Sequence, residues 1–221
     1  MKKHKTNLLV LGFVKLTGII PALLFFKPRV HYMNREVQSR RLEKPCILMS
    51  NHMSLMDFPL YLVTFPFRTI RFLISEALYT KNAVFSWFLD SLGGIRVYRD
   101  TYDFSFVGES LETLEKGTTV GIFPEGRLPI KGEYHPFRSS IVYIALRTDA
   151  PIIPIYTNGV YSITKRTQVM IGEPVYLREI CNTEEPDAAQ LERLTKYLEE
   201  EIARLKCELE RRVSADGKQS K

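Results

Sequence analysis

The sequence predicts an α/β fold in which helices flank a central, largely parallel β-sheet. Short aliphatic runs alternate with segments of helical periodicity, which is typical of chains whose parallel strands are joined by helical crossovers. Most of these runs are apolar at nearly every position, as expected of strands that are covered on both faces. The length of 221 residues and the apolar content of 45% suit one domain with a sizeable core.

The N-terminal segment, residues 1–27, is predicted to be a membrane-associating helical segment. A basic start, MKKHK, precedes residues 8–26, which are mostly apolar and hold one charged side chain, that of Lys15. A secretory signal peptide would also have this layout, but no A-x-A cleavage pattern follows. A spanning helix needs about 20 apolar residues. The segment barely reaches that length, so a helix that lies in the interface beside basic residues fits at least as well. A helix packed in the core is a further alternative.

Residues 28–212 are predicted to form the main domain. Its strands are expected at six apolar runs, which are residues 45–50, 69–75, 94–98, 118–123, 151–156 and 167–172. Residues 102–116 place their apolar side chains on one helical face, and Gly117 ends that helix. A second helix is expected over residues 137–147.

The C-terminal part of this domain, from Pro186 to Arg212, has the pattern of an amphipathic helix. Leucines and one isoleucine recur every three or four residues, and charged residues fill the other faces. Acidic residues gather near its start and two arginines stand at its end, which suits the helix dipole. The final residues, 213–221, are predicted to be a disordered tail.

The composition narrows the class of function. A net charge of +6 favours acidic partners such as anionic lipids, nucleic acids or phosphorylated substrates. The three cysteines and four histidines lack the spacing of a metal site, so no metal is expected. The sequence has no P-loop, no dinucleotide-binding glycine motif and no serine nucleophile elbow. Aromatic RNA-binding signatures are also missing, so we expect no nucleic-acid partner.

The stretch SNHMSLMDFP, residues 50–59, is the first candidate site. It follows an apolar strand, and catalytic groups of open α/β sheets gather where strands end and helices begin. A neutral His52 can take a proton from a hydroxyl, and Asp57 can orient the imidazole and stabilise the imidazolium that forms. A structural explanation is equally open. Ser54 and Asp57 have the spacing of a capping box, and His52 could be a buried histidine with satisfied hydrogen bonds.

Two further segments hold candidate ligands for an anionic group. FPEGR, residues 123–127, follows an apolar strand and offers a carboxylate, a glycine and an arginine. A tight turn with Glu125 and Arg127 exposed is the alternative. In GGIRVYRD, alternation along a strand sends Arg96 and Arg99 to opposite faces. Arg99, at the end of the strand, is better placed for a ligand.

In order and spacing these segments resemble the lysophospholipid acyltransferase family, which includes the 1-acyl-glycerol-3-phosphate acyltransferases. The NHxxxxD block of the family is matched by Asn51, His52 and Asp57. Its glycine-rich strand ending in arginine is similar to residues 93–99, and its FPEG block is matched by residues 123–126. A proline-bearing apolar strand of the family is similar to PIIPIYTNG.

The resemblance implies a membrane-associated enzyme of phospholipid synthesis. It would transfer a fatty acyl chain from a thioester, on coenzyme A or acyl carrier protein, to the free hydroxyl of 1-acyl-sn-glycerol 3-phosphate, giving phosphatidate. His52 would be the general base and Asp57 its orienting partner. No metal and no other cofactor would be required. The expected partners are membrane lipid, a lysophospholipid acceptor and the acyl donor, at the cytoplasmic face of the cell membrane.

The resemblance also implies a set of residues that bind the acceptor. They are Arg99, Glu125, Gly126, Arg127 and Arg138. Asn51 and Pro124 would support the two motifs. The chain departs from the family in two places: EGRLP replaces the common EGTRS, which moves Arg127 one residue earlier, and FRSS replaces Phe-Lys-x-Gly, which keeps a cation at Arg138.

Three alternative functions are left open by the sequence. The acceptor could be another lysophospholipid or glycerol 3-phosphate. A non-catalytic lipid-binding membrane protein of the same fold would bind liposomes without any turnover. A hydrolase that uses His52 to activate water would consume the thioester without an acceptor.

Overall fold

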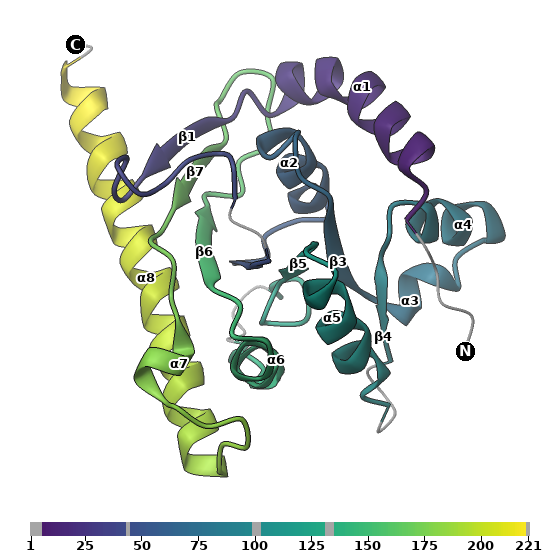
Figure 1. Cartoon of the computed structure of the whole chain (residues 1–221). Coiled ribbons are helices and arrows are strands. Elements are labelled where there is room, and N and C mark those ends of the chain that lie inside the picture. The colour runs from purple at the N-terminus through teal and green to yellow at the C-terminus, as the bar shows by residue number, and fades with distance from the viewer. Residues whose placement is uncertain (1–5, 43–44, 99–102, 131–134, 220–221) are drawn as a thin grey trace.

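A seven-stranded sheet lies at the centre of the part of the chain that the computed structural model describes, residues 6–42, 45–98, 103–130 and 135–219. In chain order its strands are β1 (Arg29–Tyr32), β2 (Ile47–Ser50), β3 (Ile70–Ser75), β4 (Ile95–Val97), β5 (Thr119–Ile122), β6 (Ile152–Thr157) and β7 (Gln168–Ile171). Across the sheet the order is β1-β7-β6-β2-β5-β3-β4. Neighbours are parallel except for β6 and β7. The prediction of a largely parallel central sheet is confirmed (Figure 1).

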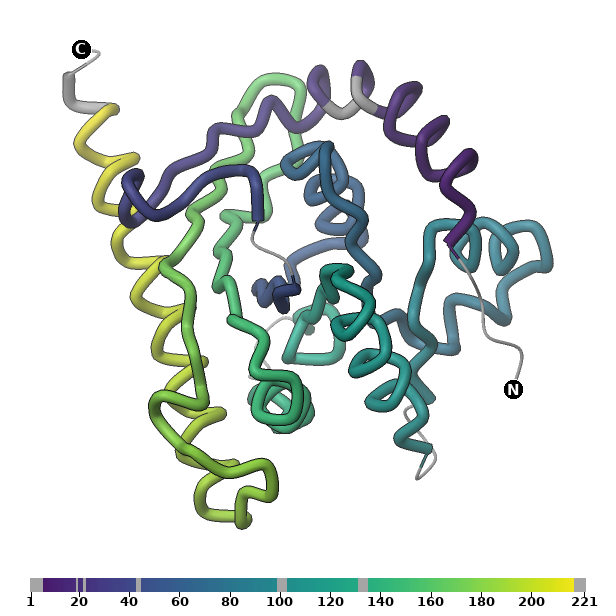
Figure 2. The backbone as a smooth tube through the Cα atoms, in the orientation of Figure 1, coloured from purple at the N-terminus to yellow at the C-terminus, as the bar shows by residue number. Residues whose placement is uncertain are grey.

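Helices connect the strands and cover both faces of the sheet. They are α1 (Leu8–Phe25), α2 (Asp57–Thr64), α3 (Glu76–Tyr79), α4 (Ala83–Ser91), α5 (Ser105–Glu115), α6 (Ser140–Thr148), α7 (Leu177–Ile180) and α8 (Ala188–Gln219). Figure 2 shows α1 passing over α2 toward α4, and the long α8 running along the opposite side of the molecule. The sheet is therefore enclosed between two helical layers.

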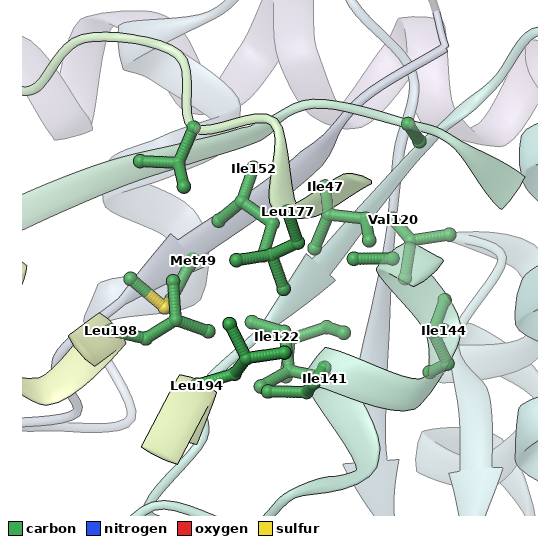
Figure 3. Close-up of a cluster of buried hydrophobic side chains, with 14 of the residues drawn as sticks. Ile47, Met49, Val120, Ile122, Ile141, Ile144, Ile152, Leu177, Leu194 and Leu198 are labelled. Carbon is green, nitrogen blue, oxygen red and sulfur yellow. The ribbon is translucent and has the colours of Figure 1, made fainter. Parts of the chain in front are cut away.

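One hydrophobic cluster fills the space between the sheet and the layer of α5, α6 and α8. Alternation along β2 sends Ile47 and Met49 into it, where they meet Ile141 of α6 and Leu198 of α8 (Figure 3). All four side chains are fully buried. The leucine stripe predicted for the C-terminal helix therefore packs on the sheet.

A second cluster lies on the other face of the sheet, beneath α2. Leu48 of β2 points into it, together with Leu60 and Tyr61 of α2 and Phe72 of β3. Both faces of β2 are thus covered, and this explains why its sequence is apolar at consecutive positions. The covered strand holds the start of the candidate site in a fixed place.

Helix α1 rests on the protein along one side only. Leu11 is buried against Leu62 of α2 and Leu92 at the end of α4. On the outer side the large apolar residues of α1 are exposed: Leu8, Leu9, Phe13, Leu16, Ile20, Leu23, Leu24 and Phe25. Among the described residues, no helix combines the length and apolar character required to cross a membrane.

Several elements differ from the sequence predictions. The short strand β1 and the helices α3, α4 and α7 were not expected. Helix α8 continues to Gln219, past residue 213, where the disordered tail was predicted to begin. The strands predicted over residues 69–75 and 167–172 are found within one residue of their predicted starts.

Candidate active site

The candidate site lies where β2 and β5, two neighbours at the centre of the sheet, reach their carboxyl ends. Asn51 and His52 follow β2 directly, and residues 123–127 follow β5. Because the two strands are parallel, their carboxyl ends meet at one edge of the sheet. Two motifs that are far apart in the sequence are thereby brought into contact.

His52 and Asp57 form a hydrogen-bonded pair, named here the dyad. Nδ1 of His52 lies 2.8 Å from Oδ2 of Asp57. The Asp57 side chain is fully buried, whereas the His52 side chain is 16% exposed. A carboxylate can only accept, so Nδ1 carries the proton and Nε2 keeps its lone pair. Within the described residues Nε2 makes no hydrogen bond, so it is available to take a proton.

The predicted capping role of Asp57 coexists with the dyad. Oδ2 of Asp57 also accepts hydrogen bonds from the backbone N–H groups of Met53, at 2.7 Å, and Ser54, at 2.8 Å. The hydroxyl of Ser54 does not complete a capping box, because it accepts from the N–H of Met56. Asp57 thus ties the loop before α2 to the first turn of that helix. The same contacts hold its carboxylate toward His52.

The imidazole of His52 is also held by an aromatic ring. Phe123 stacks on it, with ring centroids 4.2 Å apart and planes inclined by 15°. The ring of Phe123 is in turn stacked on that of Phe72, with ring centroids 5.5 Å apart. Stacking on one face and the hydrogen bond at Nδ1 leave the imidazole one orientation. The direction in which Nε2 points is therefore fixed.

Asn51 joins the loop after β2 to the end of β6. Its Nδ2 donates to the backbone carbonyl of Thr157 at 2.9 Å, and its Oδ1 accepts from the N–H of Thr157 at 2.8 Å. The side-chain amide thus continues the pairing of β2 with β6 by one further step. Asn51 is buried, and this arrangement agrees with its expected supporting role beside His52.

Glu125 faces the dyad from the end of β5. Its Oε1 accepts a hydrogen bond from the backbone N–H of His52 at 3.3 Å. Its Oε2 is buried, and in the described part of the chain it has no hydrogen-bond partner. Burial, with the nearby anions of Asp57 and Glu199, raises the pKa of Glu125 to about 7. Glu125 is therefore not the exposed turn residue of the alternative interpretation.

Replacing Glu125 with glutamine is expected to change how stability depends on pH. Because the folded-state pKa lies above the ordinary value of 4.5, wild type is most stabilised by this group at low pH and loses that contribution as pH rises through 7. Because glutamine does not ionise, the stability of Glu125→Gln does not decrease in this way as the pH rises. Its free energy of unfolding relative to wild type should therefore rise by up to about 3 kcal/mol between pH 4.5 and 8.

Urea denaturation at the two pH values measures this difference. The exposed Glu36 supplies a control, since Glu36→Gln should show no comparable rise. A difference between Glu125→Gln and wild type that stays constant with pH would contradict the raised pKa.

Two predicted cations lie beside Glu125. The Arg138 side chain packs against Gly126 so closely that a Cβ at Gly126 would lie 3.1 Å from Nε of Arg138. Gly126 also has a φ of +68°, a conformation that favours glycine. The backbone N–H of Arg138 donates to the carbonyl of Pro124 at 2.9 Å. Arg127 and Arg138 are both exposed, so each can reach a ligand that approaches this edge of the sheet.

Of the two arginines in GGIRVYRD, the structure describes Arg96. Arg96 donates to Oδ2 of Asp90 at 2.7 Å, and its guanidinium lies 4.1 Å from the centre of the Tyr79 ring. It is 24% exposed and contributes to packing between β4 and α4. Arg99 lies outside the described residues.

Sequence reasoning missed one residue at the dyad, Tyr161. Its hydroxyl donates to Oδ1 of Asp57 from the loop between β6 and β7. No motif marks this tyrosine, because the contact joins residues 104 positions apart in the chain. Within the described residues, no group of three or more His, Cys, Asp or Glu side chains is arranged to hold a metal ion.

Comparison with known proteins identifies one family and several relatives. The Acyltransferase family model matches residues 29–158. The chloroplastic 1-acyl-sn-glycerol-3-phosphate acyltransferase BAT2 of Brassica napus is 24% identical over 174 residues, which cover 73% of this chain and 49% of that protein. The beta form of 1-acyl-sn-glycerol-3-phosphate acyltransferase from Homo sapiens is 26% identical over 119 residues, covering 52% of this chain and 43% of the human protein. The chain thus spans less than half the length of these relatives.

A solved structure shares the fold. The crystal structure of PlsC from Thermotoga maritima, a 1-acyl-sn-glycerophosphate (LPA) acyltransferase, superimposes with a TM-score of 0.62. The two sequences are 26% identical, and the match covers 90% of this chain and 78% of the Thermotoga chain. The structural match thus extends beyond residues 29–158, the part that the family model matches.

Proposed function

The chain belongs to the Acyltransferase family, and on this premise we propose that it transfers a fatty acyl chain from a thioester to the free hydroxyl of 1-acyl-sn-glycerol 3-phosphate, giving phosphatidate. The observation that carries the proposal is the dyad, in which a fixed imidazole presents an unpaired Nε2 at the edge of the sheet. The relatives named as 1-acyl-sn-glycerol-3-phosphate acyltransferases support the choice of acceptor.

In the proposed reaction His52 acts as general base. Nε2 removes the proton from the acceptor hydroxyl as the hydroxyl oxygen attacks the thioester carbonyl. The buried carboxylate of Asp57 stabilises the imidazolium that forms. The imidazolium then returns the proton to the leaving thiolate. No acyl-enzyme intermediate forms, because the acceptor itself is the nucleophile, and no metal or other cofactor is proposed to take part.

The acceptor is proposed to lie over residues 124–127. The exposed guanidinium groups of Arg127 and Arg138 suit a phosphate, which arginine binds through charge-assisted hydrogen bonds. The unpaired Oε2 of Glu125 can pair with a glycerol oxygen of the acceptor, as acceptor or as donor according to its protonation. Arg99 is assigned to the same phosphate on family resemblance alone.

The acyl donor and the cellular location are proposed from the charge and the exposed apolar surface of the protein. Both acyl-CoA and acyl carrier protein are anionic, and the net charge of +6 suits either. The exposed apolar side of α1 is proposed to associate with lipid at the cytoplasmic face of the cell membrane. Residues 1–27 then act as the membrane-associating segment and residues 28–212 as the acyltransferase domain.

Thiol release from acyl-CoA by detergent-solubilised protein tests the proposal. Release is expected with lysophosphatidate and not in its absence. Similar release with lysophosphatidylcholine or glycerol 3-phosphate would contradict lysophosphatidate as the specific acceptor. Release without any acceptor would indicate a hydrolase. If neither acyl-CoA nor acyl carrier protein supports turnover with any of these acceptors, the protein binds lipid without catalysis.

Replacing Arg138 with glutamine in the same assay is expected to raise the KM for lysophosphatidate about tenfold, because a charge-assisted contact to phosphate is lost. The KM for the thioester should change little. Arg147→Gln is the matched control, since Arg147 is an exposed arginine of α6, the helix that begins two residues after Arg138, but it pairs with Glu185 and the Tyr143 ring. Equal changes in both KM values for Arg138→Gln would contradict a role in acceptor binding.

A further inference from the structure

The loop between β6 and β7 contacts the dyad through the side chain of one tyrosine. Tyr161 in this loop donates its hydroxyl hydrogen to Oδ1 of Asp57. The other carboxylate oxygen, Oδ2, accepts from His52 and from two backbone N–H groups. Both oxygens of a fully buried carboxylate therefore have donors. Among the described residues, the donor to Oδ1 is Tyr161.

The ring of Tyr161 is held in turn by the chain just after α1. Phe26 meets it edge to face, with centroids 5.3 Å apart and planes at 74°. Phe26 is 6% exposed, and its backbone carbonyl accepts from the N–H of Thr167 at 2.9 Å. The hydroxyl of Thr167 donates to the carbonyl of Val160 at 2.5 Å. These contacts close the β6–β7 loop onto the C-terminal end of α1, as Figure 2 also shows.

The protonation of this group is consistent with a donor role. Burial and the neighbouring Asp57 anion raise the pKa of Tyr161, so its hydroxyl keeps its proton. The other titratable groups near Asp57 are Tyr61 of α2 and Glu125 after β5, and Glu199 of α8 lies near Glu125. Of these, Glu125 titrates near neutral pH, so a test of Tyr161 must report on His52 directly.

We propose that Tyr161 is a positioning residue of the dyad, holding Asp57 through its hydroxyl, and that Phe26 holds the Tyr161 ring. The proposal rests on the proposed role of His52 as general base. In this arrangement the side chains of Phe26 and Tyr161 connect the end of the exposed apolar helix α1 to the dyad. Neither residue touches substrate in this scheme. Their effect passes through Asp57 to His52.

Tyr161→Phe removes the hydroxyl and keeps the ring. Asp57 then loses a donor while it stays buried, so its carboxylate becomes more basic and attracts the imidazolium proton more strongly. The imidazolium of His52 should persist to higher pH. We expect the midpoint of the His52 titration, followed by NMR of the imidazole signals, to move up by about 0.5–1 pH unit. The His52 signals are identified by their loss in His52→Ala.

Activity should follow the same change. The acid limb of the kcat/KM profile should move to higher pH by a similar amount, so kcat/KM at a fixed pH on that limb should fall by up to about three- to tenfold. KM for the acceptor should change little. Tyr197→Phe is the matched control, because Tyr197 lies on α8 and has no part in the dyad. It should leave the titration, the profile and the rate unchanged.

Phe26→Leu tests the second contact. It keeps an apolar side chain at a buried position and removes the aromatic edge. Alone it should move the His52 midpoint in the same direction by a smaller amount. Combined with Tyr161→Phe it should add nothing, since the hydroxyl that Phe26 holds in place is already gone.

The NMR titration separates this proposal from the proposed function, because it needs no turnover. An unchanged His52 midpoint in Tyr161→Phe, with thermal unfolding like wild type, would overturn the role of Tyr161. Additive shifts in the double variant would overturn the role of Phe26. A shifted midpoint in a protein without acyl transfer would uphold the positioning role and refute the proposed reaction.

Discussion

Replacing His52 with alanine is expected to lower acceptor-dependent thiol release by roughly 10²–10⁴-fold, the usual contribution of a general base. The acceptor hydroxyl then has no group at the edge of the sheet to take its proton. Asp57 cannot replace the imidazole, because its carboxylate is fully buried and held by backbone N–H groups. The loss should appear in kcat, with the KM values of acceptor and thioester little changed.

The measurement is single-turnover and steady-state thiol release at saturating lysophosphatidate. His31→Ala supplies the control, since His31 of β1 is hydrogen-bonded to Gln168 at 2.8 Å and belongs to the far edge of the sheet. Circular dichroism and thermal unfolding establish that both variants are folded. A His52→Ala protein with full activity would refute the proposed general base.

Replacing the outer residues of α1 is expected to release the protein from lipid. Leu9, Phe13 and Leu16 are 85%, 65% and 74% exposed and lie on one side of the helix. Burying each such side chain in an apolar phase contributes about 1.5–3 kcal/mol. A variant with glutamine at all three positions can no longer insert these apolar side chains into the bilayer. Even if each side chain is only partly inserted in wild type, the variant should bind anionic phospholipid vesicles at least about 100-fold more weakly.

Flotation with vesicles of phosphatidylglycerol and phosphatidylcholine measures the binding. A control variant replaces three exposed apolar residues elsewhere, Phe104, Ile180 and Val213, with glutamine. It removes a comparable number of exposed apolar side chains and should still float. If the α1 variant floats as well as wild type, the lipid contact is made by another part of the surface.

The strands that the sequence predicted are those with both faces covered. Residues 118–123 and 151–156 are mostly apolar because β5 and β6 lie inside the sheet between two helical layers. β1 escaped prediction because it is a four-residue edge strand that is only partly buried, with the sequence RVHY. Its identity as a strand depends on β7, which follows far along the chain.

The candidate site was predictable to the extent that its contacts are local. His52 and Asp57 are five residues apart, and a strand followed by a helix start brings them together. The stacking of Phe123 and the bond from Tyr161 depend on how β5 and the β6–β7 loop are placed, and no spacing rule encodes that placement. The raised pKa of Glu125 likewise comes from burial, which its place in a glycine-containing turn did not indicate.

Lys15 shows how the structure explains an odd residue in an apolar helix. Its Nζ donates to the backbone carbonyls of Pro66, at 2.9 Å, and Arg68, at 2.5 Å. Desolvation at this position lowers the pKa of Lys15. The Lys15 side chain therefore points toward the protein. The outer side of α1, which carries Leu9, Phe13 and Leu16, has no charged side chain.

The pairing of β1 with β7 has a consequence for how the protein is made. Arg29 is paired with Gln168, so β1 leaves the ribosome long before β7, its neighbour among the described strands, is synthesised. At about 5–20 residues per second this interval lasts on the order of 10–30 seconds. During that time the exposed apolar helix α1 is already available to lipid. We therefore expect membrane contact to precede completion of the sheet, and the dyad to acquire Tyr161 only as one of the last steps of folding.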